Sequence, residues 1–454
     1  MIHARSIASW FVAASSAAPL ACSKSEPPEK SVAATPADTA SAVAAPSAPP
    51  APKPPEPARP YNVLLIMIDS LRADMPWAGY PRPIAPWLTA FQERACTTYT
   101  QGYSLSSYTA KSVAPALVGE YPSAMVRDAN FFTRYPDADN LFVSERLQQA
   151  GHRTLAGHAH GYFMPALGNN QGFDDYRLTP GAVDLKAVTS VTSEALTKLA
   201  LEMLSDPKNV RLAEKQRFFA YFHYLDPHHT YEKHPGHPDF GAKARDLYDN
   251  EVHFTDAWVG KLLDFAKQQP WWEQTAVIVT ADHGEGFGER GHYRHAYELW
   301  ESLVKVPLLI CVPGAKPQRI DVRRSHIDLA PTILDLMGVA AKPPLRGQSL
   351  LPEVFGQVEP KPRAIVVDLP RADLMDRRRA VIADGWKLVA FGDDTRFQLF
   401  HIERDPWEEQ ELSEKEPQQL ARMRDVYQQE SAKIETKPVV GGGKLKGAPP
   451  GQRW

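Results

Sequence analysis

The sequence predicts an α/β fold built on a large, mostly parallel sheet. Two apolar runs, Val63–Ile68 and Ala276–Thr280, contain no charged residue and have the composition of strands that are covered on both faces. A third run, Phe218–Leu225, is rich in aromatic residues and predicts another strand. Apolar residues at helical spacing between Tyr248 and Leu262 predict a core helix.

A small antiparallel subdomain is expected near the carboxyl end of the chain. Four short segments alternate enough between apolar and polar residues to form such a sheet: Ala364–Asp368, Arg379–Ile382, Lys387–Ala390 and Gln398–His401. A helix should then begin at Pro417, because proline is favoured in the first turn and apolar residues follow at helical spacing.

The first 60 residues differ from the rest of the chain. Residues 1–21 combine a charged start with a short apolar run, which predicts a secretory signal. Leu20-Ala21-Cys22 resembles the cleavage box of bacterial lipoproteins, so we expect export to the periplasm or outer membrane with a lipid anchor on Cys22; soluble secretion is the alternative. Residues 22–60 contain eleven prolines and no aromatic residue, which predicts a disordered, extended tether.

Charge and cysteine content narrow the possible functions. The net charge of −3 over 454 residues gives no bulk attraction to nucleic acid. The three cysteines, Cys22, Cys96 and Cys311, lack the Cys/His spacing of a thiolate zinc site. Cys96 and Cys311 can form a disulfide only if the fold brings them together.

Two of the predicted strands end in groups that bind metals. Asp69 follows the first apolar run, and Asp282 and His283 follow the second. Open α/β sheets bind ligands at the carboxyl edge of their strands. The mixed oxygen and nitrogen set suits a divalent cation such as Mn²⁺, Zn²⁺, Mg²⁺ or Ca²⁺.

A segment rich in hydroxyl groups leads into a short predicted helix that Gly119 ends. Pro115 fits best in the first turn, so the helix is expected to begin near Ser112. A hydroxyl at the start of a helix meets free N–H groups and the positive end of the dipole, which suits an anionic ester. Residue type alone leaves four candidates open: Ser106, Ser107, Thr109 and Ser112.

Three segments, Asn62–Asp69, Thr109–Pro122 and Thr280–Gly286, together resemble the sulfatase family of the alkaline-phosphatase superfamily, in the same order along the chain. The resemblance covers nearly everything after residue 60. It implies an alkaline-phosphatase-like fold, with a large central mixed, mostly parallel sheet flanked by helices in a catalytic domain at 61–345. It also implies a C-terminal antiparallel-sheet-and-helix subdomain at 346–436, followed by a flexible tail at 437–454.

The resemblance also implies a site around one divalent metal ion. Counting back from Gly119-Glu120-Tyr121-Pro122 places the nucleophile on Thr109. The implied metal ligands are Asp69, Thr109, Asp282 and His283.

Three further side chains are expected at the ester. His228 matches the histidine of an Asp-Pro-His motif that contacts the ester group in the family. His295 stands where sulfatases keep a lysine on the leaving-group oxygen, and it either protonates a leaving alkoxide or binds a second metal. Lys111 is a candidate to replace positive charge beside the nucleophile, with a solvated lysine as the alternative.

Two departures from the family bear on the chemistry. The segment Thr109–Val113 lacks the Cys/Ser-x-Pro-x-Arg signal that is oxidised to formylglycine, and Ser70 replaces a second aspartate. The segment is instead similar to that of phosphoethanolamine and glycerol-phosphate transferases, which use an unmodified threonine. A threonine ester must be resolved by a second attack on the central atom, which is easier at phosphorus than at an unactivated sulfate.

The expected function is therefore a metal-dependent hydrolase or transferase that acts on phosphoric or sulfuric esters, an anionic class of substrate. One alternative is a sulfatase that uses threonine directly on sulfuric esters. The other is a non-catalytic, tethered binding lipoprotein on the same scaffold.

Overall fold

The computed structural model describes residues 60–130, 133–136, 139–180, 182, 191–372 and 375–439. The predicted signal at 1–21, the tether up to residue 59 with Cys22, and the tail from residue 440 lie outside the described residues. None of the helices in the described ranges is long and apolar enough to cross a membrane.

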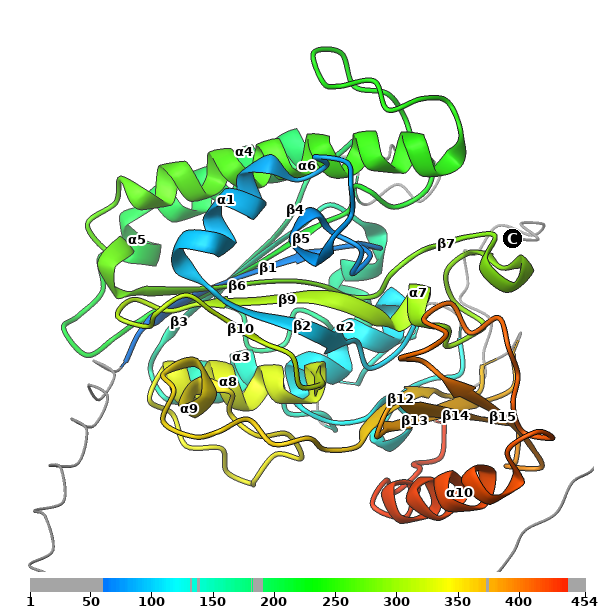
Figure 1. Ribbon diagram of the computed structural model, residues 1–454. Helices are drawn as coiled ribbons and strands as arrows, with labels where there is room; N and C mark the ends of the chain where they lie inside the picture. Colours follow the sequence, from blue (N-terminus) through cyan, green and yellow to red (C-terminus); the bar gives the residue numbers. More distant parts are fainter. Residues whose placement is uncertain are drawn as a thin grey trace, which may run out of the picture. The chain divides into compact units, whose positions relative to one another are not determined.

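A mixed sheet forms the centre of the catalytic region (Figure 1). In the described chain its strands are β1 (Asn62–Ile68), β2 (Thr97–Tyr103), β3 (Arg153–His158), β4 (Asp175–Leu178), β5 (Phe218–Tyr224), β6 (Thr275–Ala281), β9 (Lys305–Cys311), β10 (Gln318–Ile320) and β11 (Arg324–Ser325). The order is β10-β2-β9-β6-β1-β5-β3-β4, with β11 beside β2. β9 runs antiparallel to β6 and β2, whereas β1, β3, β4, β5 and β6 are parallel. The predicted mixed, mostly parallel sheet is confirmed.

Helices cover both faces of this sheet (Figure 1). One face carries α1 (Pro86–Ala95), α4 (Ser193–Ser205) and α6 (Ala244–Lys267); the other carries α2 (Thr109–Val118), α3 (Val143–Gln149) and α8 (Leu329–Leu336). Three short helices complete the region: α5 (Pro207–Val210), α7 (Glu301–Val304) and α9 (Leu351–Val354). Alternate residues of β1 enter the two cores, with Leu64 and Ile66 in one and Val63 and Leu65 in the other. An unbroken apolar run is thus the expected pattern for this strand.

Helix α2 differs from its prediction. It begins at Thr109 rather than near Ser112, and Pro115 lies inside it. Proline in a helix interior removes the hydrogen bond to the carbonyl four residues earlier, here that of Lys111. Most of the helix is buried, so tertiary packing outweighs the local preference of proline. Gly119 ends the helix with a φ of 75°, as the sequence predicted.

The predicted carboxyl-terminal sheet is also confirmed. Its strands are β12 (Ile365–Leu369), β13 (Arg378–Ala383), β14 (Trp386–Phe391) and β15 (Arg396–His401), all antiparallel. Helix α10 (Pro417–Ser431) packs on this sheet through Met423 and Tyr427. The boundary between residues 345 and 346 stays a prediction.

A buried ion-pair cluster joins the carboxyl-terminal sheet to the central region. Nζ of Lys387, on β14, lies 3.0 Å from Oε1 of Glu301 and 2.9 Å from Oε1 of Glu408. Glu301 begins α7, and its other oxygen accepts a hydrogen bond from the hydroxyl of Tyr103 on β2. Backbone N–H groups of Gly284 and Glu285 in turn donate to carbonyls of α7. The cluster therefore supports the loop that follows β6.

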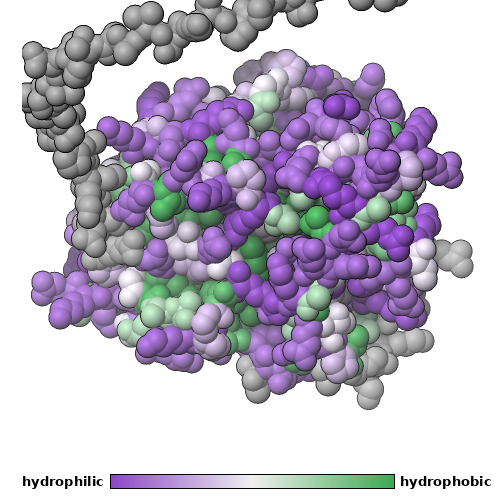
Figure 2. All heavy atoms as spheres, turned by 60° about the horizontal axis from the view of Figure 1, so that its bottom comes forward, coloured by the Kyte–Doolittle hydropathy of each residue, from purple (hydrophilic) through white to green (hydrophobic). Residues whose placement is uncertain are grey.

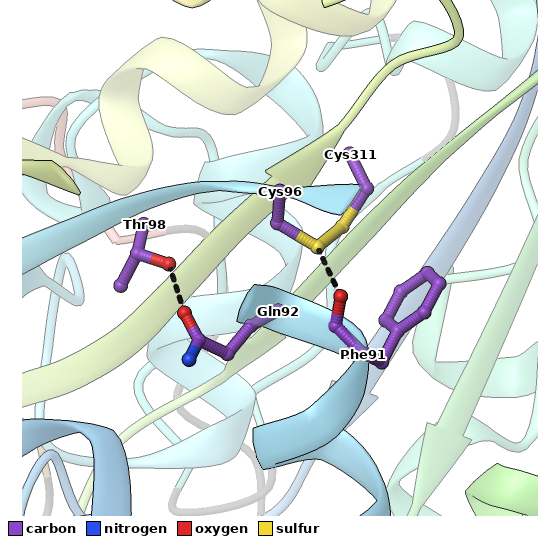
Figure 3. The surroundings of a disulfide bond; sticks show 5 residues. All are labelled: Phe91, Gln92, Cys96, Thr98 and Cys311. Carbon is purple, nitrogen blue, oxygen red and sulfur yellow. Dashed lines mark hydrogen bonds between the residues drawn. A yellow bond between two sulfur atoms is a disulfide. The ribbon is translucent and has the colours of Figure 1, made fainter. Parts of the chain in front are cut away.

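Cys96 and Cys311 form a disulfide, which the sequence alone left open (Figure 3). Antiparallel pairing of β2 with β9 sets Thr97 opposite Ile310, so the two cysteines are the next facing positions. Their Cα atoms are 4.0 Å apart. The bond closes a long loop, since 215 positions separate the two residues.

The surface is mainly polar on the face shown in Figure 2, with hydrophobic residues in scattered groups. Large hydrophobic side chains that are exposed in the described ranges are Val191, Tyr293, Val358, Trp407 and Val439. Tyr293 is the most exposed of these at 68%. It lies in a small hairpin of β7 (Gly286–Phe287) and β8 (Tyr293–Arg294), which follows the end of β6.

Candidate active site

Parallel register brings three ionisable side chains to one edge of the sheet. β1 lies between β5 and β6, with Ile68 paired to Ala281 and Met67 paired to His223. Asp69 and Asp282 are each the next residue along their strands, so they meet at the same edge. Helix α2 starts close by and contributes Thr109.

The carboxylates and imidazoles form a compact, buried corner. Nε2 of His283 lies 3.7 Å from Asp69 Oδ1 and 3.5 Å from Asp282 Oδ2. Nε2 of His223 lies 3.4 Å from Asp69 Oδ2 and 4.0 Å from Asp282 Oδ2. All four side chains are at most 1% exposed. Ligand atoms of Asp69, His223 and Asp282 lie within 4.8 Å of one another, a separation that one metal ion can span.

Two further observations fit this corner to a cation. Asp282 Oδ2 is buried and has no hydrogen-bond partner among the described residues, although buried carboxylate oxygens normally have one. Nδ1 of His283 lies 2.8 Å from the carbonyl oxygen of Gly284, so Nδ1 carries a proton and Nε2 is the nitrogen that can bind a metal. Carboxylate oxygens with free imidazole nitrogens are the donor set of a divalent transition metal.

The electrostatics of the corner agree with that fit. Burial opposes ionisation of Asp69, but His228, His223 and His283 together hold its pKa well below the usual value. Burial also opposes a charge on His283, yet the carboxylates of Asp282 and Asp69 raise its pKa. The two carboxylates thus attract positive charge, which a bound cation would supply.

Ser70, in place of a second acid, supports Asp69 and Asp282 rather than extending the acidic set. Its hydroxyl donates to Asp69 Oδ1 at 2.8 Å, and its backbone N–H donates to Asp282 Oδ1 at 3.2 Å. The φ angle of Ser70 is 59°, a left-handed conformation that is strained for a serine. Strain of this kind persists where surrounding contacts impose it, and it clusters at functional sites.

Among the four candidate hydroxyls, that of Thr109 reaches the corner. It donates to Asp69 Oδ2 at 3.3 Å, and its oxygen lies 3.1 Å from Nε2 of His283. The hydroxyl of Ser112 instead donates to the carbonyl of Ser106, which fixes the loop before the helix. The Oγ atoms of Ser106 and Ser107 are buried without a hydrogen-bond partner in the described chain.

Lys111 is buried rather than solvated, at 1% exposed. Its Nζ lies 5.7 Å from the ring centroid of Tyr108. The hydroxyl of Tyr108 bonds that of Tyr162 at 2.9 Å, which holds the Tyr108 ring in place near Lys111. The structure therefore places the Lys111 side chain in the first turn of α2, two residues after Thr109.

His295 and His228 continue outward from His283. The ring centroids of His283 and His295 are 4.3 Å apart, and those of His295 and His228 are 5.0 Å apart. Burial lowers the pKa of His295, although neighbouring Glu285 opposes that shift. Nδ1 of His228 lies 2.9 Å from the carbonyl oxygen of His229, so its Nε2 remains available for another contact. Both predicted ester-binding histidines thus lie beside the corner.

A family model described as Sulfatase matches residues 61–339. This chain belongs to the Sulfatase family. A second model, described as N-sulphoglucosamine sulphohydrolase, C-terminal, matches residues 288–435. The two matches together extend from the start of β1 to the end of α10.

Proteins similar to this Sulfatase-family chain include two sulfatases and a phosphonate monoester hydrolase. A choline-sulfatase of Rhizobium meliloti is 31% identical over 38% of this chain and 33% of its own length. Arylsulfatase K of Gallus gallus is 28% identical over 34% of this chain and 30% of its own length. The chain therefore spans about a third of the length of these relatives. A phosphonate monoester hydrolase structure from Silicibacter pomeroyi has a TM-score of 0.67 at 19% identity, covering 83% of this chain and 96% of its own. That likeness shows the shared fold.

Two site residues of this Sulfatase-family chain were missed by reasoning from sequence. His223 is the sole imidazole inside the fully buried strand β5, and an ionisable group in such a run was the available signal. Glu285 stands among the glycines after His283, is buried, and contacts both Tyr231 at 2.7 Å and His295 at 3.2 Å. Glu285 lies between two glycines, and this local sequence gave no comparable indication that it belongs to the site.

Proposed function

We propose that this protein is a metal-dependent hydrolase or transferase of phosphoric or sulfuric esters, with Thr109 as its nucleophile. The observation that carries the proposal is the position of the Thr109 hydroxyl, 3.3 Å from Asp69 Oδ2 and 3.1 Å from Nε2 of His283. That oxygen lies at the first turn of α2, where free N–H groups favour an anionic ester.

The residues proposed to hold one divalent ion are Asp69, Thr109, Asp282 and His283, with His223 as an added ligand. A divalent ion bound by these residues would lower the pKa of the Thr109 hydroxyl and polarise the ester oxygen. Two imidazoles in the set favour Zn²⁺ over Mn²⁺, Mg²⁺ and Ca²⁺, which prefer oxygen ligands.

The chain's own groups account for the remaining steps. Thr109 Oγ1 passes its proton to Asp69 Oδ2, which accepts its hydrogen bond, and forms a bond to the phosphorus or sulfur atom. The bond from that atom to the leaving oxygen breaks, and the leaving alkoxide departs with a proton. His295 or His228, in its doubly protonated form, supplies that proton from Nε2; the ring of His295 lies next to that of His283, and the ring of His228 lies next to that of His295. Glu285 accepts a hydrogen bond from Nδ1 of His295, which directs Nε2 of the same ring away from Glu285.

Release of the threonine ester favours phosphorus over sulfur as the central atom. An unmodified threonine cannot expel the group by forming an aldehyde, so water or an alcohol must attack the central atom in a second displacement. The fold alone does not distinguish phosphorus esters from sulfate esters as substrates, because sulfatases and phosphonate monoester hydrolases share it. A sulfatase that uses Thr109 directly is therefore the second candidate.

The nucleophile is tested with metal-loaded protein and 4-nitrophenyl esters of sulfate, phosphate and phenylphosphonate. Thr109→Ala should lose turnover, about 1,000-fold or more, because removal of a nucleophile leaves only binding and electrostatic stabilisation. Thr395→Ala, at an exposed turn, is the matched control. Stopped reactions should contain protein whose mass is increased by the transferred group, located on residue 109.

Specific outcomes contradict the assignment. Full activity in Thr109→Ala rules out this nucleophile. Faster turnover of the sulfate ester than of both phosphorus esters favours the sulfatase alternative. Metal binding without turnover of any ester in the panel supports the non-catalytic binding lipoprotein.

We also propose that the protein is exported and anchored through a lipid on Cys22. The disulfide between Cys96 and Cys311 supports export, because such bonds persist in oxidising compartments. Cell fractionation and mass analysis of the full chain should find a lipidated, membrane-associated protein. Cys22→Ala should move it to the soluble exported fraction, and membrane association that survives this change argues against the anchor.

A further inference from the structure

The β7–β8 hairpin places an arginine close to the metal corner. Arg294, on β8, pairs with Gly286 on β7, and Gly286 lies just beyond Asp282 and His283. His295, the next residue, contacts Glu285, and its ring centroid lies 4.3 Å from that of His283. The position of Arg294 is therefore tied to the active-site loop on both sides.

The backbone around Arg294 holds a strained conformation. The φ angles of Arg294, Ala296 and Tyr297 are 66°, 66° and 63°, although none of the three is glycine. Each such residue costs on the order of 1 kcal/mol or more, and the surrounding structure must impose it. The backbone N–H of Ala296 donates to the carbonyl of Ser107 at 2.8 Å, which fastens this segment to the loop before Thr109.

The Arg294 guanidinium is held on one side and open on the other. Its Nη2 lies 3.2 Å from Nε2 of His229, and a guanidinium can only donate, so the imidazole nitrogen accepts. The side chain is exposed, and no carboxylate of the described residues lies within 4.0 Å of it. Arg290, in the same hairpin, is instead packed 4.3 Å from the ring centroid of Trp300.

A row of imidazoles connects the corner to this guanidinium. It runs from His283 through His295 and His228 to the adjacent His229, which contacts Arg294. The row passes from fully buried His283 to exposed Arg294. The row therefore leads from the corner beside Thr109 to a positive charge at the surface.

We propose that Arg294, oriented by His229, binds a second oxyanion of the substrate, on the part that leaves. Sulfate, phosphate and carboxylate each present two neighbouring oxygens, which can accept hydrogen bonds from two N–H groups of one guanidinium. The preferred substrate is thus an ester with another anionic group nearby. The inference rests on the proposed function, because it locates the ester at Thr109.

The test compares two leaving groups that differ in one charge. The esters are those of 5-hydroxy-2-nitrobenzoate and of its methyl ester, joined to whichever acid the protein turns over best. The metal-loaded wild type should prefer the carboxylate form about 10-fold in kcat/KM, the value of one charge-assisted hydrogen bond at about 1.4 kcal/mol. Salt should reduce this preference, because an exposed charge is screened.

Arg294→Gln should reduce the ratio between the two substrates to about one, and Arg294→Lys should retain part of it because the charge remains without the fork. Arg211→Gln, an exposed arginine at the end of α5, is the matched control and should keep the wild-type ratio. An unchanged ratio in Arg294→Gln, or no preference in the wild type, overturns the proposal.

Calorimetric titration of both esters into metal-loaded Thr109→Ala separates this inference from the proposed chemistry. The carboxylate form should bind about 10-fold more tightly, and Arg294→Gln in the same background should abolish the difference. If that binding difference holds while the wild type turns over neither ester, the catalytic proposal fails and the anion subsite stands. Equal binding of the two esters overturns the subsite whatever the activity.

Discussion

Nε2 of His223 lies 3.4 Å from Oδ2 of Asp69, across the neighbouring parallel strands β5 and β1. The other ring nitrogen of His223 is 2.8 Å from the hydroxyl of Tyr221, which fixes the orientation of the ring. A histidine near the carboxyl end of the fully buried strand β5 thereby faces the acidic corner. This position makes His223 a candidate ligand beside Asp69 and Asp282.

His223→Gln should lower the affinity for Zn²⁺ or Mn²⁺ by about 10-fold or more, because it removes a ligand that a hydrogen bond holds in place. Affinity is measured by titration against a competing chelator. The metal-dependent rise in melting temperature should shrink in parallel. His401→Gln, on β15 of the carboxyl-terminal sheet, is the control. Unchanged affinity in His223→Gln would remove His223 from the ligand set.

Lys387→Met should destabilise the protein by about 3–5 kcal/mol in urea unfolding, because Glu301 and Glu408 lose the cation that compensates their burial. Burial already raises the pKa of Glu408 to about 7, with Lys387 opposing the shift. Without the lysine, both carboxylates should take up protons more readily. The loss in the free energy of unfolding of Lys387→Met, relative to the wild type, should therefore be smaller at pH 5.5 than at pH 7.5.

The exposed Lys415→Met is a matched control for that experiment and should unfold like the wild type. A loss below about 0.5 kcal/mol in Lys387→Met, the range of ordinary surface substitutions, contradicts the structural role of the cluster.

Reduction of the Cys96–Cys311 disulfide should lower the free energy of unfolding by about 2–5 kcal/mol, because the bond restricts a long loop in the unfolded chain. Urea unfolding with and without a reductant measures the effect. The double variant Cys96→Ser/Cys311→Ser should show the same loss and no response to the reductant. A double variant as stable as the oxidised wild type would contradict this account.

The protein should lose stability as the pH falls below about 6.5, and His326 is one cause. Burial lowers the pKa of His326 to about 3, whereas an unfolded histidine titrates near its ordinary value of 6.5. The unfolded state therefore binds the extra proton first. The stabilisation is complete above pH 6.5 and is lost progressively toward pH 3. At pH 5 the loss from this residue is about 2 kcal/mol relative to pH 7.5.

His326→Gln should reduce that acid sensitivity in urea unfolding at the two pH values. Glutamine can still donate to Thr280 Oγ1, which lies 2.8 Å from Nε2 of His326, so part of the native contact remains. An identical pH dependence in variant and wild type would show that His326 is not responsible.

Much of the fold could be predicted from the sequence, because strands that are buried on both faces consist almost entirely of apolar residues. The apolar runs of β1 and β6 and the aromatic run of β5 were found to within one residue at each end. The start of α2 differs from the prediction, because burial of the helix overrides the local preference of Pro115 for a first turn. Lys111 shows the same limit, since nothing local separates a buried lysine from a solvated one.

The sequence by itself determined which strands end in Asp69 and in Asp282-His283, and parallel strands must bring such ends to one edge. It also narrowed the hydroxyls to a short segment. Only the tertiary structure decided that Thr109 reaches Asp69, that His223 faces the same corner, and that Cys96 meets Cys311. The physical reason is register: these contacts depend on which strands pair and at which residue, and that choice is set by packing far along the chain.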